Sequence, residues 1–226
     1  KSAAMANDPG LSLEAWNRAV ALAGNAPGEV RFRYYASRER ILDRLGLRDE
    51  QKRDLEALLE LADSAEEKTL HALAGAAACT RWSNYLEITS NYTEAFSWAE
   101  KALGFCESAL PRLSPNTPHY AEFLEFKSRS LYCMGRALWR QGSLDETTLY
   151  LEQAANAARS GGFRSLESLV LRNLGAARFH AGDINTAIRL TEESLSLCRE
   201  LGDESGAGAA LNNLADENRF VGRYRE

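Results

Sequence analysis

The sequence predicts an all-α protein, built as a right-handed superhelical solenoid of antiparallel helix pairs. Two observations predict this fold. Alanine and leucine dominate, valine and isoleucine are scarce, and only 5 of the 226 residues are proline, a composition that favours helices over strands. A turn motif also recurs at a fixed spacing, which is typical of stacked helical repeats.

The recurring turn consists of a glycine and a short polar stretch. Its last three glycines follow one another at intervals of 40 residues, at Gly142, Gly182 and Gly222. An earlier copy begins at Ser90, 52 residues before Gly142, and the excess lies in a proline-containing loop at 111–118. A degenerate copy begins at Gly46. We therefore predict helix pairs joined by this turn, with one irregular insertion at 111–118.

The residues around each turn predict how the helices of a pair end and pack. A glycine fits the left-handed position that ends a helix, and Ser143 or Asp183 can cap the helix that follows. Before each turn a large apolar residue precedes a small one, which allows close helix contact; these pairs are Met134-Gly135, Leu174-Gly175 and Leu214-Ala215. After the turn, helix-spaced positions predict a buried face: Ala95, Ala99, Ala102; Thr147, Leu151, Ala154; Ala187, Thr191, Ser194.

We expect ten helices, separated by short turns. Their predicted ranges are 11–23, 29–45, 49–63, 66–89, 93–110, 119–141, 144–159, 163–181, 184–201 and 203–221. We divide the chain into degenerate helical repeats at 1–65 and clear repeats at 66–226, the latter at about 66–110, 119–160, 163–201 and a truncated 203–226. Because the chain starts at Lys1 and stops within a repeat, we also expect it to be part of a longer polypeptide.

The repeat resembles the tetratricopeptide repeat (TPR), through Leu174-Gly175 followed by Gly182-Asp183-Ile184 and Ala187. The 40-residue period is longer than the usual 34, and is similar to the repeats of kinesin light chains and of bacterial regulators. The segment Leu211-Asn212-Asn213-Leu214-Ala215 also resembles the sequence motif of kinesin-light-chain repeats. These resemblances imply a scaffold that binds a protein or peptide, with Asn212 and Asn213 clamping a peptide backbone.

A second resemblance concerns the first third of the chain. The run 37–46 followed by 54–62 looks like the sensor arrays of large bacterial signal-transduction ATPases, the STAND family, with LuxR-like or cyclase-linked members. This resemblance implies a sensor region attached to an ATPase or effector module elsewhere in the full-length protein. The P-loop pattern G-x-x-x-x-G-K-[ST] is absent from these 226 residues.

Composition and motifs point away from several other classes. The formal net charge of −5 argues against direct nucleic-acid binding, and no apolar run reaches the length of a membrane helix. The four cysteines lie in apolar helical patterns without zinc spacing, so we expect buried thiols and a cytoplasmic location. The histidines His71, His119 and His180 stand far apart, and no nucleophile elbow is present. We expect no enzyme activity, metal or cofactor.

The first helix of each pair is expected to line the concave surface. Repeat register places there Tyr132, Arg136, Trp139 and Arg140; Arg172, Ala176, Phe179 and His180; Asn212, Asp216, Arg219 and Phe220; and, earlier, Thr80, Asn84, Glu87 and Ile88. Arginine binds carboxylates with two hydrogen bonds, so this groove predicts an acidic peptide or helix as partner.

Alternatives remain open at this stage. Trp139 and Phe179 can instead be core residues, the arginines can pair with neighbouring carboxylates, and Asn212 and Asn213 can bridge helices. At the level of function, the alternatives are a small-ligand (inducer) receptor in the same solenoid, a free-standing adaptor, a helical-repeat enzyme subunit and a self-assembly scaffold.

Overall fold

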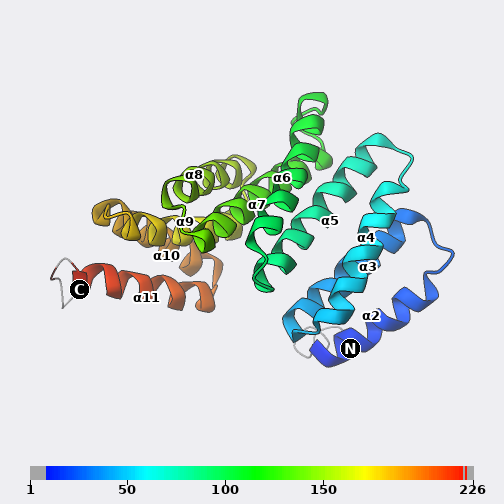
Figure 1. Cartoon of the computed structure of the whole chain (residues 1–226), viewed down its shortest axis with the longest axis horizontal. Coiled ribbons are helices and arrows are strands. Elements are labelled where there is room, and N and C mark those ends of the chain that lie inside the picture. Colours follow the sequence, from blue (N-terminus) through cyan, green and yellow to red (C-terminus); the bar gives the residue numbers. More distant parts are fainter. Residues whose placement is uncertain (1–8, 221, 223–226) are drawn as a thin grey trace.

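The computed structural model describes residues 9–220 and 222. All regular elements in this part of the chain are helices (Figure 1). They are α2 (Pro9–Leu22), α3 (Gly28–Leu45), α4 (Arg48–Asp63), α5 (Lys68–Ile88), α6 (Tyr92–Ala109), the short 3-10 helix η1 (Leu110–Arg112), α7 (Pro118–Gln141), α8 (Leu144–Gly161), α9 (Arg164–His180), α10 (Ile184–Leu201) and α11 (Glu204–Phe220).

The ten expected helices are confirmed, and their described ends lie within two residues of the predicted ones. The predicted end of the last helix at 221 lies outside the described residues. The insertion at 111–118 contains the end of η1 and a turn whose Thr117 hydroxyl accepts a hydrogen bond from the Tyr120 amide and so caps α7.

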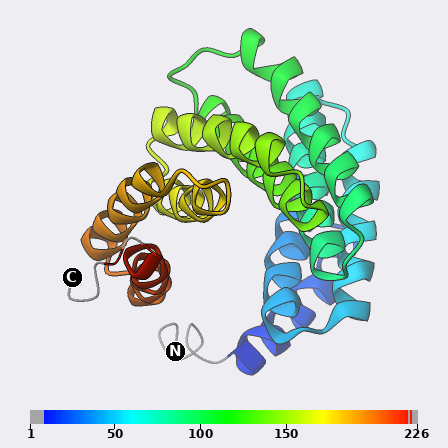
Figure 2. The ribbon, with the colours of Figure 1, turned by 60° about the vertical axis from the view of Figure 1, so that its left-hand side comes forward.

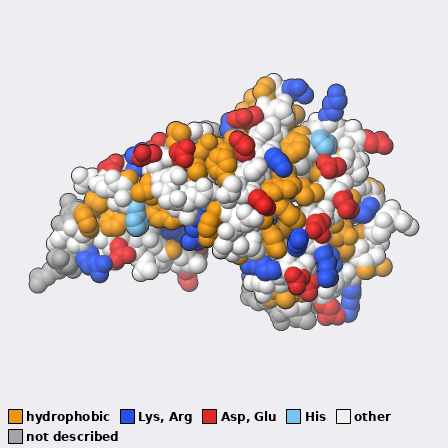
Figure 3. Space-filling view, viewed as in Figure 1, with side chains coloured by type: hydrophobic (Ala, Val, Ile, Leu, Met, Phe, Trp, Pro, Cys, Tyr) orange, Lys and Arg blue, Asp and Glu red, His pale blue; other side chains and the backbone are white. Residues whose placement is uncertain are grey.

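Consecutive helices pack against each other throughout, and the odd-numbered helices also contact one another. α5 packs against α7, and α9 contacts both α7 and α11, whereas the even-numbered helices make no such contacts with each other. The stack therefore curves, with the odd-numbered helices on its inner side, as Figure 2 shows. On the face viewed in Figure 3, hydrophobic side chains gather over α5 and α6, with charged groups around them.

The repeated turn adopts the predicted left-handed backbone. Gly46, Gly142, Gly182 and Gly222 have φ between 70° and 85°, and Ser90, which stands at the same place in the earlier copy, has φ of 65°. Asp183 caps α10 by accepting a hydrogen bond from the Thr186 amide. The prediction for Ser143 was wrong, since its side chain makes no capping hydrogen bond and only its carbonyl accepts from Thr147 N.

The small residues before the turns do permit close helix contact. A Cβ built on Gly135 would lie 2.9 Å from Leu151 of α8, and one on Gly175 would lie 2.5 Å from the Thr191 hydroxyl and 3.2 Å from the Ala187 carbonyl of α10. All nine positions of the predicted buried face are at most 2% exposed. Serines on these faces satisfy their hydroxyls through backbone carbonyls, as Ser194 does with Ser168 O at 2.7 Å.

The first repeats are held by charges as well as by apolar packing. The buried Glu39 carboxylate accepts hydrogen bonds from Gln51 of α4 and Arg81 of α5, both at 2.8 Å. Arg38 makes two hydrogen bonds to the buried Asp54 carboxylate, at 2.8 and 2.5 Å. These pairs fix α3 against α4 and α5, in addition to the buried apolar cluster of Ala36, Leu55, Leu58 and Ala78.

Candidate functional site

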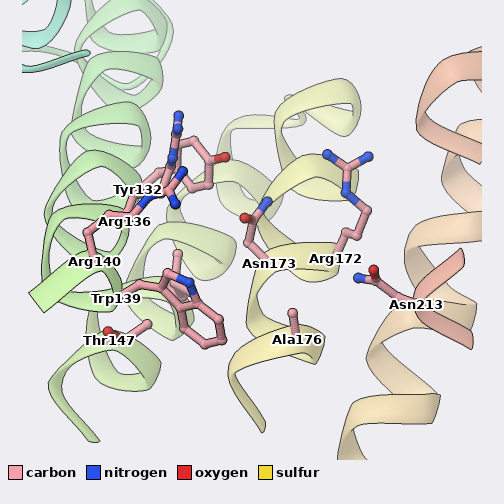
Figure 4. A pocket seen from close by; sticks show the side chains of 11 residues that line it. Tyr132, Arg136, Trp139, Arg140, Thr147, Arg172, Asn173, Ala176 and Asn213 are labelled. Carbon is pink, nitrogen blue, oxygen red and sulfur yellow. The ribbon is translucent and has the colours of Figure 1, made fainter. Parts of the chain in front are cut away.

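A pocket of about 510 Å³ opens on the inner face between α7, α9 and α11. Figure 4 shows side chains from these helices and α8 around it. Its lining comprises Tyr132, Gly135, Arg136, Trp139, Arg140, Thr147, Leu151, Arg172, Asn173, Ala176 and Asn213. Seven of the residues predicted for the concave groove are thus brought together: Tyr132, Arg136, Trp139, Arg140, Arg172, Ala176 and Asn213.

The α7 wall combines core packing with an exposed cationic edge. Tyr132 is 8% exposed and belongs to the main hydrophobic cluster, while Trp139 packs at the edge of that cluster. The Arg136 guanidinium lies over the Tyr132 ring, 5.6 Å from its centroid. Burial raises the pKa of the Tyr132 hydroxyl, so this hydroxyl stays protonated at neutral pH. The alternative prediction, that Trp139 is a core residue, was therefore partly correct, because Trp139 packs against the core cluster and also lines the pocket.

Two of the predicted arginines already have a carboxylate partner. Glu87 of α5 is 6% exposed and accepts hydrogen bonds from Arg136 Nη2 at 2.5 Å and Arg140 Nε at 3.1 Å. Glu87 was expected to line the concave surface. It pairs with both arginines, and its single negative charge compensates one of their two positive charges. These side chains shape the pocket, and the three together keep a net charge of +1.

Arg172 differs from them, because it makes no ion pair with any described residue. On the same helix, the Asn173 amide nitrogen donates to the Leu169 carbonyl at 2.8 Å, which leaves its amide oxygen for a ligand. Opposite, the Asn213 side chain of α11 has no hydrogen bond within the described part of the chain. Figure 4 shows Arg172 and Asn213 extending into the space between α9 and α11. The pocket thus offers one guanidinium without an ion pair among the described residues, two amides, and the net positive charge of the Arg136, Arg140 and Glu87 side chains.

Sequence reasoning missed Asn173. It stands 40 residues before Asn213, so the period of the repeat places both on the same face of successive inner helices. The register used for the prediction had selected Asn212, which is exposed and does not line the pocket. The recurrence of asparagine at a spacing of 40 could have identified the pair.

Phe179 and His180 lie beside the pocket, in a row of rings. His180 contacts Trp139 edge to face at 5.0 Å and Phe179 at 5.7 Å, and Phe179 contacts Phe220 at 5.6 Å. Phe220 is 71% exposed. The aromatic row extends the pocket edge from α7 to α11 and leaves an apolar rim facing solvent.

The other predicted residues are distributed elsewhere. Asp216 and Arg219 pair with each other at 3.7 Å on the exposed side of α11, and Arg219 lines a separate hollow of about 850 Å³ between α10 and α11. Thr80 and Asn84 line another hollow, of about 630 Å³, which shares Tyr132 and Arg136 with the pocket. The inner face therefore carries a continuous groove from α3 to α11.

Three further features of the described residues bear on other kinds of chemistry. No group of three or more His, Cys, Asp or Glu side chains is placed to hold a metal ion. Cys79, Cys106 and Cys198 are buried free thiols, and burial raises the pKa of Cys79 to about 11 and that of Cys106 to about 12. None of these helices has the length and apolar character needed to span a membrane.

Comparison with solved structures agrees with the repeat architecture. The crystal structure of BtubC (BKLC) from P. vanneervenii matches with a TM-score of 0.65 and 14% identity, covering 94% of this chain and 84% of that one. A putative kinesin light chain with nearly identical TPR-like repeats from Podosopora anserina matches with a TM-score of 0.60 and 18% identity, covering 85% and 88% of the two chains. At these identities the likeness shows the fold, a TPR-like repeat solenoid. No protein-family model and no curated protein matches the chain.

Proposed function

We propose that this chain is a protein-binding scaffold whose inner groove takes an extended peptide segment with acidic side chains. A TPR-like fold suggests an interaction scaffold. The observation that carries the proposal is the uncompensated Arg172 between the amides of Asn173 and Asn213 in a pocket of about 510 Å³.

The chemistry of these three groups suits a peptide. A guanidinium binds a carboxylate through two parallel hydrogen bonds, and it does so most strongly where the surroundings exclude water. The Asn173 amide oxygen can accept from a backbone N–H, and the Asn213 amide can donate to a backbone carbonyl. The ring row of Trp139, His180 and Phe179 adds rigid apolar contact area next to the polar groups.

The wider context is part of the same proposal. The sequence resemblance to STAND-type sensor arrays supports a scaffold that belongs to a larger bacterial signalling or transcription regulator in the cytoplasm. In such a protein the groove would receive the signal as a protein or peptide, and an ATPase or effector module would respond. A free-standing adaptor uses the same groove without that module.

The proposal is tested with a pair of fluorescein-labelled decapeptides, one rich in Asp and Glu and one with Asn and Gln at the same places. We expect fluorescence anisotropy to show saturable binding of the acidic peptide only. Arg172→Ala should weaken this binding by about tenfold, since one charge-assisted pair contributes roughly 1.4 kcal/mol or more. Asn213→Ala should weaken it by about threefold.

Arg189→Ala is the matched control. Arg189 lies on α10, its side chain is 66% exposed, and its nearest carboxylate is 3.9 Å away. The Arg189→Ala substitution removes the same charge from the chain as Arg172→Ala does, and Arg189 does not line the pocket. Equal loss of binding in Arg172→Ala and Arg189→Ala would indicate unspecific attraction of charge and would overturn the proposal.

A further inference from the structure

A further hollow lies on the inner face near the other end of the molecule. It shares no residue with the pocket around Arg172 and only Phe126 with the hollow of about 630 Å³ beside that pocket. It is about 520 Å³ in size, and it is formed by the first turns of α3, the end of α4, the first half of α5 and the start of α7. It exists because α3 makes little contact with α5, whereas α5 packs along α7. The space between α3 and α5 is therefore left open.

The walls of this hollow are apolar and come from four helices. They comprise Phe32, Leu61, Leu70, Leu73, Ala74, Ala77 and Phe126. Ala74 and Ala77 are at most 5% exposed and form part of the core beneath it, while Phe32, Leu70, Leu73 and Phe126 are only partly buried. Uncovered apolar surface of this kind in a concave site favours a ligand with an apolar body.

The rim is polar and carries more acid than base. Glu29, Glu66 and Glu122 line it, against Arg33 and His119. Arg33 forms an ion pair with Glu29 at 2.6 Å, and His119 Nδ1 makes a hydrogen bond with Glu122 at 3.0 Å. Glu66 has no ion pair with any residue that the structure describes. One carboxylate at the mouth of an apolar hollow is thus left without a cationic partner.

We propose that this hollow binds a small amphipathic organic cation, with its apolar body between Phe32, Leu73 and Phe126 and its ammonium group at Glu66. The volume lies within the range of about 300–1,000 Å³ that small-molecule sites occupy. Residues of four helices, α3, α4, α5 and α7, surround the hollow, which suits a compact ligand better than an extended peptide. The site shares no residue with the pocket around Arg172, so the two proposals can fail independently.

The test uses three probes that share one apolar body: 4-phenylbutylamine, 4-phenylbutanol and 4-phenylbutyrate. Binding to the whole chain is measured by isothermal titration calorimetry and by ligand-detected NMR. We expect saturable binding of the amine with a Kd below about 5 mM, and at least about fivefold weaker binding of the alcohol. The butyrate should bind most weakly of the three.

Two variants locate the binding. Glu66→Gln should weaken the amine about threefold and leave the alcohol unchanged, because it removes only the rim charge. Ala74→Leu should weaken both, since the larger side chain fills the hollow; a thermal melt checks that this variant folds. Glu100→Gln, an exposed change on α6, is the control and should bind all three probes as the original chain does.

Three results would overturn the inference. Equal binding of amine and alcohol would mean that the rim carboxylate plays no part. Preferred binding of butyrate would mean that the partial positive charge at the starts of α3, α5 and α7 dominates the rim. Unchanged amine binding in both Glu66→Gln and Ala74→Leu would place the probe elsewhere.

Discussion

Glu87 of α5 and Arg136 of α7 form an ion pair of 2.5 Å across the inner face, with the Glu87 side chain 5% exposed and that of Arg136 30% exposed. Arg140 joins the same carboxylate. The arginines of the groove therefore have different roles. Arg136 and Arg140 hold α7 against α5, whereas Arg172 remains available to a ligand.

The first prediction concerns this pair. Arg136→Ala should lower the free energy of unfolding by about 2 kcal/mol, because it leaves a buried carboxylate with only the weaker Arg140 contact. Urea unfolding measures the loss. Combining Arg136→Met with Glu87→Gln should restore most of it, since no uncompensated buried charge remains. If Arg136→Ala unfolds like the original chain, the pair is not structural.

The second prediction concerns the turn at Ser90. Its φ of 65° is unfavourable for a residue with a Cβ, and the later repeats have glycine there. Ser90→Gly should therefore raise the free energy of unfolding by about 0.5–1 kcal/mol, seen as a higher Tm. Ser64→Gly is the control: Ser64 has φ of −82°, so glycine there should be neutral or destabilising. A gain at both positions would show that the backbone angle is not the cause.

The third prediction tests the close contact within a helix pair. Gly175→Ala should destabilise the fold by about 2 kcal/mol, because the new methyl group meets Thr191 and the Ala187 backbone and α9 must move away from α10. Gly104→Ala, at a helical glycine with nothing within 4 Å, should instead stabilise by up to about 1 kcal/mol through helix propensity. Chemical denaturation of both variants would show opposite signs. Two changes of the same sign would contradict the packing argument.

The fourth prediction concerns Glu217, which replaces the alanines of earlier repeats at Ala137 and Ala177. Its carboxylate is 1% exposed; one oxygen accepts from the Thr191 hydroxyl at 2.9 Å and the other has no partner. Burial raises the pKa of Glu217 above 4.5. The protonated form is thus favoured in the folded state, and the stability it contributes is lost as the pH rises through the raised pKa.

Glu217→Gln should accordingly gain about 1 kcal/mol at pH 7, because the amide carries no charge and still accepts from Thr191. The gain over the original chain should shrink as the pH falls toward 4.5. Thermal melts of both proteins from pH 4.5 to 7.5 measure this difference. A gain that is independent of pH would mean that the Glu217 carboxyl does not titrate in this range.

The fold followed from the sequence because its determinants are local and repeated. Each determinant acts within one helix pair: a left-handed glycine such as Gly182, a cap such as Asp183, or a small residue such as Gly175. The spacing of these residues along the sequence was therefore enough to predict the helix pairs. The turn at Ser90 was also predicted, because the residues around Ser90 match the pattern of the other turns, although serine is unusual at a left-handed position. Repeat register transfers such features from one pair to the next.

The candidate site was predicted less well, for a physical reason. Register places Arg136 and Arg172 on the same surface, but only the stacking of α5 against α7 brings Glu87 to one of them. The hollow near Phe32 was not predicted at all, because it arises from a separation between α3 and α5. Contacts between helices of different repeats depend on curvature, which the spacing of residues does not encode.

The most direct test of the scaffold proposal is an NMR titration of the isotope-labelled chain with the acidic decapeptide, with assigned side-chain amides. The proposal predicts that chemical-shift changes concentrate on the Asn173 and Asn213 amides and around Arg172, and that they vanish in Arg172→Ala. Shifts confined to the outer helices α8 and α10, or an absence of shifts at saturating peptide, would contradict it.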